Sequence, residues 1–336
     1  MDVRKVASGV DVRLVSEKGV ERRPVEGLEA LLHREDGLVW VDIPNCDEEA
    51  VRVLSEVFGF HPLAIRDCVD RNHVPKVHPY ADHVFVVLHA SEPGKGGHVH
   101  LLELDQFVGP NYLVTIHGPV NPAAPADAAL RETRAVLKRI ETGRLDARSS
   151  FELSYAIVSA LTRHQEAFVA TLAREAGLLE QQVMSGDIGD PEQFLEELFR
   201  ARHQLLTVRT MAAQSREIYG RMATLSRLVP LEARPLVEDL VDQFGRVRSV
   251  ADGEKEFLQG VIEFYQTRTE TKMTIAAERL AVIAAVTLPI TALSSIYGMN
   301  VIVNEQTHLV QLIVVLAVMA VMSAALLRWT KRQGWW

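Results

Sequence analysis

The sequence predicts an α+β domain that is followed by a long helical hairpin, a stalk helix and two C-terminal transmembrane helices. Short β-branched and aromatic runs, bounded by Gly and Pro, crowd the first 145 residues. Proline is absent from 236 to 288, so one helix can run through this stretch. Two uncharged apolar runs, Leu280 to Tyr297 and Leu309 to Leu327, are each long enough to cross a bilayer core.

Composition narrows the functional classes. The 336 residues carry a net charge of −8, which argues against nucleic-acid binding and fits a protein that handles cations. The two cysteines, Cys46 and Cys68, show no CxxC spacing, and we expect both to be reduced thiols without a bridge. Residues 1–25 lack an apolar core behind a basic start. We therefore expect the N-terminal part to stay on the cytosolic side.

The α/β domain spans residues 1–145. It begins with a polar segment, 1–25, in which we expect one short strand. Gly37 to Pro44 reads as a buried strand because it is short, β-branched and aromatic and ends at a proline. Asn45 or Asp47 can cap the helix that follows, which ends at Gly59. A short helix begins at Pro62, since proline favours the first helical turn.

The second half of this domain alternates strands and breaks. We expect strands over 82–90, 99–108 and 111–117, with a Gly-rich hairpin loop over 92–97. A proline-alanine linker over 119–125 precedes a helix over 126–140. The pattern predicts a mixed sheet with helices.

Long helices dominate from residue 149 onward. Residues 149–185 and 190–225 form a helical hairpin, 146–230, that is broken at an acidic Gly-Pro tip. The next helix, from about 235 to 297, would be about 95 Å long at about 1.5 Å per residue. It divides into a stalk, 231–279, and the first span, 280–297. An outer loop, 298–308, the second span, 309–327, and a basic and aromatic tail, 328–336, complete the chain.

The flanking charges orient the two spans. Lysines and arginines precede the first span and follow the second, at Arg268, Lys272, Arg279, Arg328, Lys331 and Arg332, whereas the loop 298–308 has none. By the positive-inside rule both termini are cytoplasmic and the loop faces outward.

The first span carries polar and small residues along one face, with Thr287, Thr291, Ser294 and Ser295 near its outer end. One interpretation is a packing face between helices, a common use of small residues in membranes. The other is a pore lining, and spacing alone does not decide between them. Pro289 leaves a backbone carbonyl without its helical donor, which only protein or a water-filled cavity tolerates. Two spans cannot enclose a conduit, so a pore would need several copies.

The turn at Gly298 follows the polar face. Gly298 lets the chain bend, and Asn300 offers a neutral amide oxygen. A ring of such amides could hold hydrated Mg²⁺, which prefers oxygen ligands and is slow to lose water.

These features resemble the CorA family of magnesium transporters, and the resemblance covers most of the chain. The Gly-Met-Asn signature stands intact with a proline upstream, and two N-terminal-domain motifs appear in the expected order. The matching segments are Tyr297 to Asn300 with Pro289, Phe60 to Leu63 with Asp67, Pro75 to Val77, and Tyr112 to Thr115.

The resemblance implies a funnel-shaped homopentamer in the cell (inner or plasma) membrane that is a channel and not an enzyme. It would admit Mg²⁺, with Co²⁺ and Ni²⁺ as further candidates. Gly298, Met299 and Asn300 would form the selectivity ring, and Glu305 keeps one carboxylate of the outer loop. The first spans would line the pore through Thr274, Ala277, Leu280, Ala281, Ala284, Leu288, Thr291 and Ser295.

The resemblance also implies a regulatory Mg²⁺ site. Asp67 would pair with Asp239 of a neighbouring subunit, and the bound ion would hold the pore closed when cytosolic Mg²⁺ is plentiful. Further ligands, or alternatives to these two, are Asp70, Glu238 and Asp242.

The sequence departs from the family at the cytoplasmic neck. Thr274 and Ala277 are smaller than the residues that are usual there, so we expect the constrictions at Leu280 and Leu288. Two alternative functions stay open. One is a proton-coupled Zn²⁺ transporter of the same fold, although the twelve histidines form no ligand quartet with structural-site spacing. The other is a membrane-anchored scaffold or enzyme, although residues 1–145 show no P-loop or GxGxxG motif.

Overall fold

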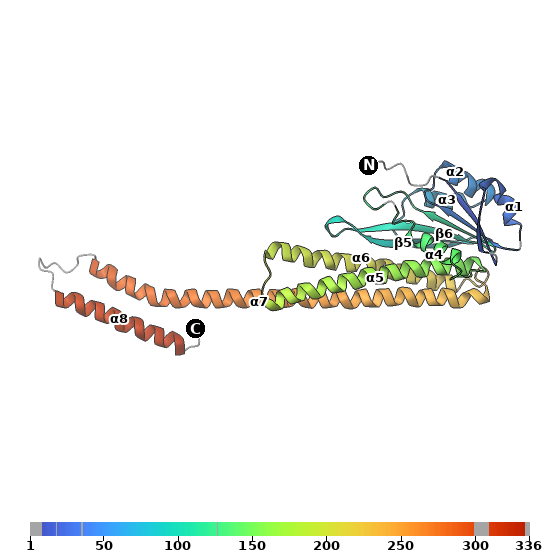
Figure 1. Cartoon of the computed structure of the whole chain (residues 1–336). Coiled ribbons are helices and arrows are strands. Elements are labelled where there is room, and N and C mark those ends of the chain that lie inside the picture. Colours follow the sequence, from blue (N-terminus) through green and yellow to red (C-terminus); the bar gives the residue numbers. More distant parts are fainter. Residues whose placement is uncertain (1–8, 18, 35, 126, 299–308, 333–336) are drawn as a thin grey trace. The chain divides into compact units, whose positions relative to one another are not determined.

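The computed structural model describes residues 9–17, 19–34, 36–125, 127–298 and 309–332. The chain divides into two compact units, Met1–Val261 and Ile262–Trp336. Figure 1 shows the strands and short helices near the N-terminus and the long helices that follow. The predicted fold class, an α/β domain with long helices and two candidate C-terminal spans, is confirmed.

A seven-stranded mixed sheet forms the centre of the first unit. Its strand order is β2-β1-β3-β7-β6-β5-β4, and only the β3–β7 pair is parallel. The strands are β1 (Asp11–Ser16), β2 (Gly19–Arg23), β3 (Leu38–Ile43), β4 (Lys76–Pro79), β5 (Val84–Pro93), β6 (Val99–Val108) and β7 (Tyr112–His117). The expectation of one strand before residue 25 was wrong, because the chain reverses at Gly19, with φ 111°, into a hairpin.

Short helices cover one face of the sheet. They are α1 (Leu28–Leu32), α2 (Glu48–Arg52), which continues as a short π-helix (Val53–Val57), and α3 (Pro62–Val69). Asp47 caps α2 by accepting the Ala50 N–H at 3.0 Å, which decides between the two predicted caps and contributes about 1 kcal/mol. The apolar residues of these helices share one buried cluster with strands β1, β3, β5, β6 and β7.

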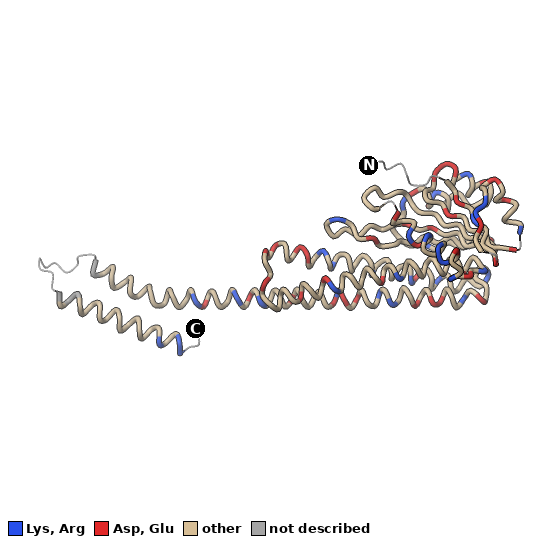
Figure 2. The backbone as a smooth tube through the Cα atoms, in the orientation of Figure 1, with Lys and Arg blue, Asp and Glu red and all other residues tan. Residues whose placement is uncertain are grey.

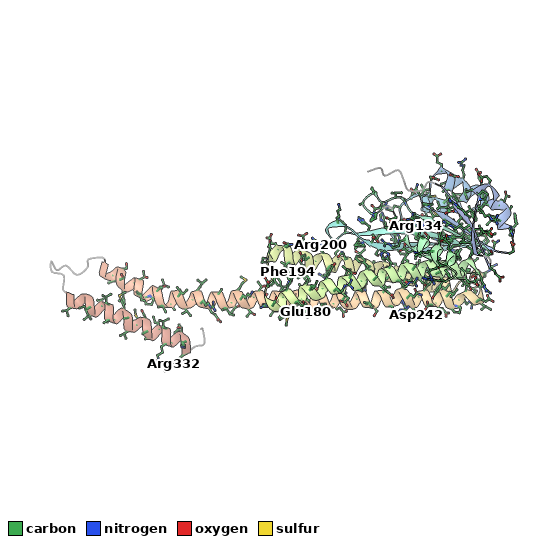
Figure 3. All side chains as sticks on the ribbon, viewed as in Figure 1. Arg134, Glu180, Phe194, Arg200, Asp242 and Arg332 are labelled. Carbon is green, nitrogen blue, oxygen red and sulfur yellow. The ribbon has the colours of Figure 1, made fainter. Side chains whose placement is uncertain are left out.

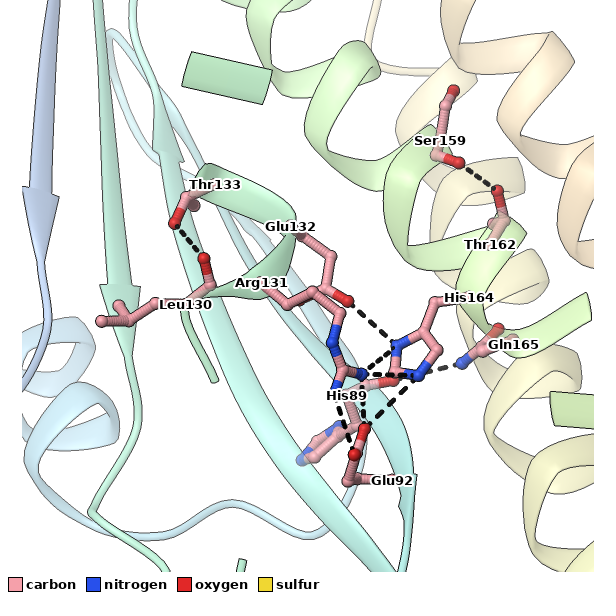
Figure 4. A network of polar contacts seen from close by, with 10 residues as sticks. All are labelled: His89, Glu92, Leu130, Arg131, Glu132, Thr133, Ser159, Thr162, His164 and Gln165. Carbon is pink, nitrogen blue, oxygen red and sulfur yellow. Dashed lines mark hydrogen bonds and ion pairs between the residues drawn. The ribbon is translucent and has the colours of Figure 1, made fainter. Parts of the chain in front are cut away.

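The opposite face is covered by α4 (Arg131–Glu141) and α5 (Ser150–Ser185). Helix α4 begins five residues later than residue 126, where we expected it, because residues 127–130 form turns in which backbone N–H groups bond three residues back. A polar network at this junction joins β5, α4 and α5 (Figure 4). In it, Arg131 donates to both oxygens of Glu92, and His164 lies between Glu92 and Glu132, at 3.3 and 3.1 Å.

The helical hairpin is confirmed as α5 and α6 (Pro191–Ala223). Helix α5 ends at Gly186, which adopts φ 83°, and Asp190 caps α6. Helix α7 (Arg234–Gly298) then runs for 65 residues. Up to Val261, its buried apolar residues recur at spacings of three, four and seven, at Val237, Leu240, Phe244, Val247, Ala251, Leu258 and Val261. This stripe packs α7 into the first unit, with Phe244 stacked on Tyr219 of α6.

The second unit contains the rest of α7 and α8 (Leu309–Arg332). Among the described residues, two helices are long and apolar enough to cross a membrane, one in α7 and one in α8. In Figure 2 the apolar stretches are free of charged residues, and Lys331 and Arg332 lie at the end of α8. Pro289 lies inside α7.

Candidate functional site

The predicted pore-lining residues occupy one seam of α7. Seven of them recur at alternating spacings of three and four residues, which places them on one side of the helix, and Leu280 lies beside the seam. All eight are exposed in the chain: Thr274, Ala277, Leu280, Ala281, Ala284, Leu288, Thr291 and Ser295. Figure 3 shows side chains along the apolar stretches of α7 and α8.

The threonines of this region use their hydroxyl protons within the helix. Thr274 Oγ1 donates to the Glu270 carbonyl at 3.0 Å, and Thr291 Oγ1 donates to the Thr287 carbonyl at 2.8 Å. Each hydroxyl therefore presents oxygen lone pairs, and no proton, to its surroundings. Such a surface suits a cation or the waters that hydrate it.

The signature itself is only partly described. Gly298 is the last residue of α7. Met299, Asn300 and Glu305 lie outside the described residues. The selectivity ring therefore stays a prediction.

Asp67 lies near the end of α3. The helix starts at Pro62, and the His61 imidazole accepts the Leu63 N–H at 3.1 Å. The Asp67 carboxylate is half-buried and faces the Lys76 ammonium at 3.2 Å, between the Nζ and Oδ2 atoms. A cation that binds Asp67 must therefore compete with Lys76.

The loop behind Asp67 is tied to the sheet. The Asn72 side chain donates to the Asp67 carbonyl at 2.7 Å and to Glu103 Oε1 at 2.6 Å, and its backbone N–H donates to Glu103 Oε2 at 2.7 Å. Burial raises the pKa of Glu103, and burial together with the Glu103 charge raises the pKa of Asp105 well above its usual range.

Asp239 lies on α7 within the first unit, against α5. The Tyr155 hydroxyl donates to its Oδ2 atom at 2.7 Å, and the Gln243 amide donates to the same atom at 2.6 Å. These two hydrogen bonds hold the pKa of Asp239 below its usual value, and the Arg246 charge adds to them. The carboxylate therefore stays ionised.

The single chain does not bring the two aspartates together. Within the described residues, no hydrogen bond or ion pair joins Asp67 to Asp239, and no group of three or more His, Cys, Asp or Glu is arranged to hold a metal ion. The further candidates Asp70, Glu238 and Asp242 are exposed.

Sequence reasoning missed the partners of both aspartates. Lys76 stood in a quoted motif, but nothing in its spacing shows that it faces Asp67 across a turn. Tyr155, Ser159 and Thr162 recur at spacings of four and three residues on α5, and this polar stripe in an otherwise apolar face is a signal that could have been found.

Metal-ion transport proteins, one of them putative, match most of the chain. It is 23% identical over 299 residues to the putative metal ion transporter YfjQ of Bacillus subtilis, which covers 88% of this chain and 89% of that protein. It is 23% identical over 303 residues to the cobalt/magnesium transport protein CorA of Thermotoga maritima, which covers 88% of this chain and 83% of that protein.

A solved structure shares the fold. The complete structure of the CorA magnesium transporter from Methanocaldococcus jannaschii superposes with a TM-score of 0.80, covering 98% of this chain and 100% of that chain at 18% identity. The sequence pattern of the CorA-like Mg²⁺ transporter proteins matches residues 35–332. The chain therefore belongs to the CorA-like Mg²⁺ transporter family.

Proposed function

We propose that the chain assembles as a homopentamer that conducts Mg²⁺ into the cell, driven by the membrane potential and closed by cytosolic Mg²⁺. The observation that carries this proposal is the exposed seam of small and hydroxyl residues on α7, within a family of metal-ion transporters. Two candidate spans per chain cannot enclose a pore, so several seams must face one axis.

The seam suits a hydrated ion. Its threonine oxygens are acceptors because their protons are already bonded to the helix. The side chains of Ala277, Ala281 and Ala284 are small, which lets neighbouring helices approach one another closely. Leu280 and Leu288 are the bulkiest members of the set, and we assign the apolar constrictions to them.

Self-assembly is supported by a second stripe on α7. Val250, Phe257 and Phe264 are 52%, 38% and 46% exposed and recur every seven residues. A seven-residue apolar repeat is the pattern of helices that pack on one another as supercoiled bundles. Such a stripe is covered when copies of the chain associate through their stalks.

We assign ion selection to Asn300, whose amide oxygens would contact the water shell of the ion. Asn300→Ala is expected to abolish Mg²⁺ uptake into proteoliposomes. Asn304→Ala, in the same loop, is the matched control and should leave uptake near that of the unmodified chain. Equal uptake by the two variants would refute the assignment.

Cytosolic regulation is assigned to Asp67 and Asp239 on adjacent copies. Asp239 fits an oxygen-seeking cation because it is ionised and its Oδ1 atom accepts no hydrogen bond from the described residues. Asp67 fits less closely, since Lys76 already faces it. Mg²⁺ should protect the chain from proteolysis, and Asp67→Ala and Asp239→Ala should each remove that protection. Unchanged protection would place the regulatory site elsewhere.

Orientation and ion preference complete the proposal. Basic residues on either side of the apolar stretches support a protein of the cell membrane with both termini in the cytoplasm. We include Co²⁺ and Ni²⁺ among the conducted ions. The zinc alternative predicts a different result, namely Zn²⁺ flux that depends on an imposed pH gradient and exceeds the Mg²⁺ flux. That result would refute the assignment of Mg²⁺ as the main conducted ion.

A further inference from the structure

A ladder of polar side chains joins α5 to α7 in the first unit. Its members are Tyr155, Ser159 and Thr162 on α5, and Asp239 and Gln243 on α7. Tyr155, Ser159 and Thr162 recur at helical spacing, as do Asp239 and Gln243, so each set shares one side of its helix. Ser159 and Thr162 appear on α5 in Figure 4.

Gln243 occupies the centre of this ladder. Its amide nitrogen donates to Asp239 Oδ2 at 2.6 Å and to Ser159 Oγ at 3.1 Å, and its amide oxygen accepts from Thr162 Oγ1 at 2.6 Å. The side chains of Gln243, Ser159 and Thr162 are buried, at 9%, 4% and 1% exposure. These partners fix one orientation of the amide, in which its nitrogen faces Asp239 and Ser159 and its oxygen faces Thr162.

Asp239 is held on one side only. The Tyr155 hydroxyl and the Gln243 amide both end on Oδ2. Oδ1 accepts no hydrogen bond from the described residues. The Asp239 residue is only half-buried, so this oxygen can be reached from solvent. The two donors thus fix the direction of the second oxygen.

We infer that Tyr155 and Gln243 are positioning residues for Asp239: they hold Oδ2 and direct Oδ1 toward a divalent cation, which ties ion binding at Asp239 to the packing of α5 on α7. This inference rests on the proposed function, in which Asp239 is a regulatory ligand. Mg²⁺ demands near-ideal coordination geometry, so a carboxylate that is fixed beforehand binds it more tightly than one that rotates.

The test measures the Mg²⁺ concentration that gives half-maximal protection of the detergent-solubilised full chain against proteolysis. Tyr155→Phe removes only the hydroxyl, and Gln243→Met keeps the length of the side chain without its amide. We expect each variant to need about two- to tenfold more Mg²⁺, because a carboxylate that is no longer held must be ordered when the ion binds, at a cost of about 0.5–1.5 kcal/mol.

Ser154→Ala is the matched control. Ser154 precedes Tyr155 on α5 and is 4% exposed, and its hydroxyl donates to Gln106 Oε1 at 2.6 Å, on the sheet side. The control therefore loses a buried hydrogen bond of α5 without touching Asp239. We expect its half-maximal Mg²⁺ concentration to stay within about twofold of the unmodified chain, and its thermal midpoint without Mg²⁺ to fall about as far as that of Tyr155→Phe.

Two results would overturn the inference, and they are distinguishable from each other. If Asp239→Asn removes the protection while Tyr155→Phe and Gln243→Met bind Mg²⁺ like Ser154→Ala, the ladder only joins the helices. If Asp239→Asn itself responds to Mg²⁺ like the unmodified chain, the regulatory assignment fails and the positioning role fails with it.

Discussion

Lys76 offers an unusual test of the regulatory site, because its removal should strengthen ion binding. The Lys76 ammonium lies 3.2 Å from the Asp67 carboxylate, and the two side chains are 33% and 24% exposed. Mg²⁺ that binds Asp67 must displace or tolerate this positive charge. Lys76→Gln removes the charge and keeps a group that can hydrogen-bond to Asn72, which Lys76 contacts.

The size of the effect follows from the exposure of the pair. Partly exposed ion pairs are screened by solvent and contribute about 0.2–1 kcal/mol. With about 1.4 kcal/mol per tenfold change, the upper half of this range corresponds to a fall of about three- to fivefold in the Mg²⁺ concentration for half-maximal effect. The full Coulomb energy of two charges at this distance would predict far more, but it does not apply to a solvent-screened pair.

The assay is protection of the detergent-solubilised chain against proteolysis during a Mg²⁺ titration. Lys255→Gln is the control, because Lys255 is 32% exposed and faces Asp252 at 3.8 Å, away from both regulatory aspartates. It removes the same charge from the chain. If Lys76→Gln needs as much Mg²⁺ as Lys255→Gln, or more, then Lys76 does not compete with the ion and Asp67 is not a ligand.

Three further predictions concern other parts of the chain. Asp105→Asn should stabilise the first unit increasingly as the pH rises above the ordinary carboxyl pKa of 3.8. A buried carboxyl with a raised pKa leaves stability at its full value below 3.8 and lowers it as the pH rises toward the raised pKa, whereas an amide does not ionise. Thermal midpoints of the variant and the unmodified chain that change in parallel would contradict this. Phe257→Asp should lower the molecular mass of the detergent complex measured by light scattering, whereas Glu256→Asp should not. Thr291→Val should reduce Mg²⁺ uptake, because it replaces an oxygen acceptor in the seam by a methyl group. Ser323→Ala is the control, because it removes a hydroxyl from α8 that donates to the Met319 carbonyl at 2.8 Å; equal uptake by the two variants would show that the seam is misassigned.

The sequence was sufficient for the architecture because the strongest signals are long and periodic. The apolar runs, the absence of proline before Pro289 and the glycine at Gly186 predicted the helices α5 to α8 closely. The first 25 residues were misread as one strand because the hairpin signal is a single glycine in a polar segment, Gly19. Helix α4 was placed too early because turns with helix-like spacing precede Arg131.

Sequence reasoning identified the two candidate aspartates of the site but not the residues that contact them. Asp67 and Asp239 were named from a family resemblance, but their hydrogen-bond and charge partners depend on tertiary contacts. Lys76 reaches Asp67 from the start of β4, and Tyr155 reaches Asp239 from a helix 84 positions earlier in the sequence. No local sequence pattern predicts contacts between residues so far apart in the chain. The polar stripe on α5 was visible in the sequence, yet only the structure shows that it faces α7.

The most direct test of the central claim is Mg²⁺ flux in proteoliposomes that contain the purified full chain, under an imposed negative-inside potential and without a pH gradient. The proposed channel predicts influx when Mg²⁺ is low on the side of the two termini, and loss of influx when Mg²⁺ on that side is high. Absence of influx under the potential, or influx that ignores Mg²⁺ on the side of the termini, would contradict a Mg²⁺ channel that its own ion closes.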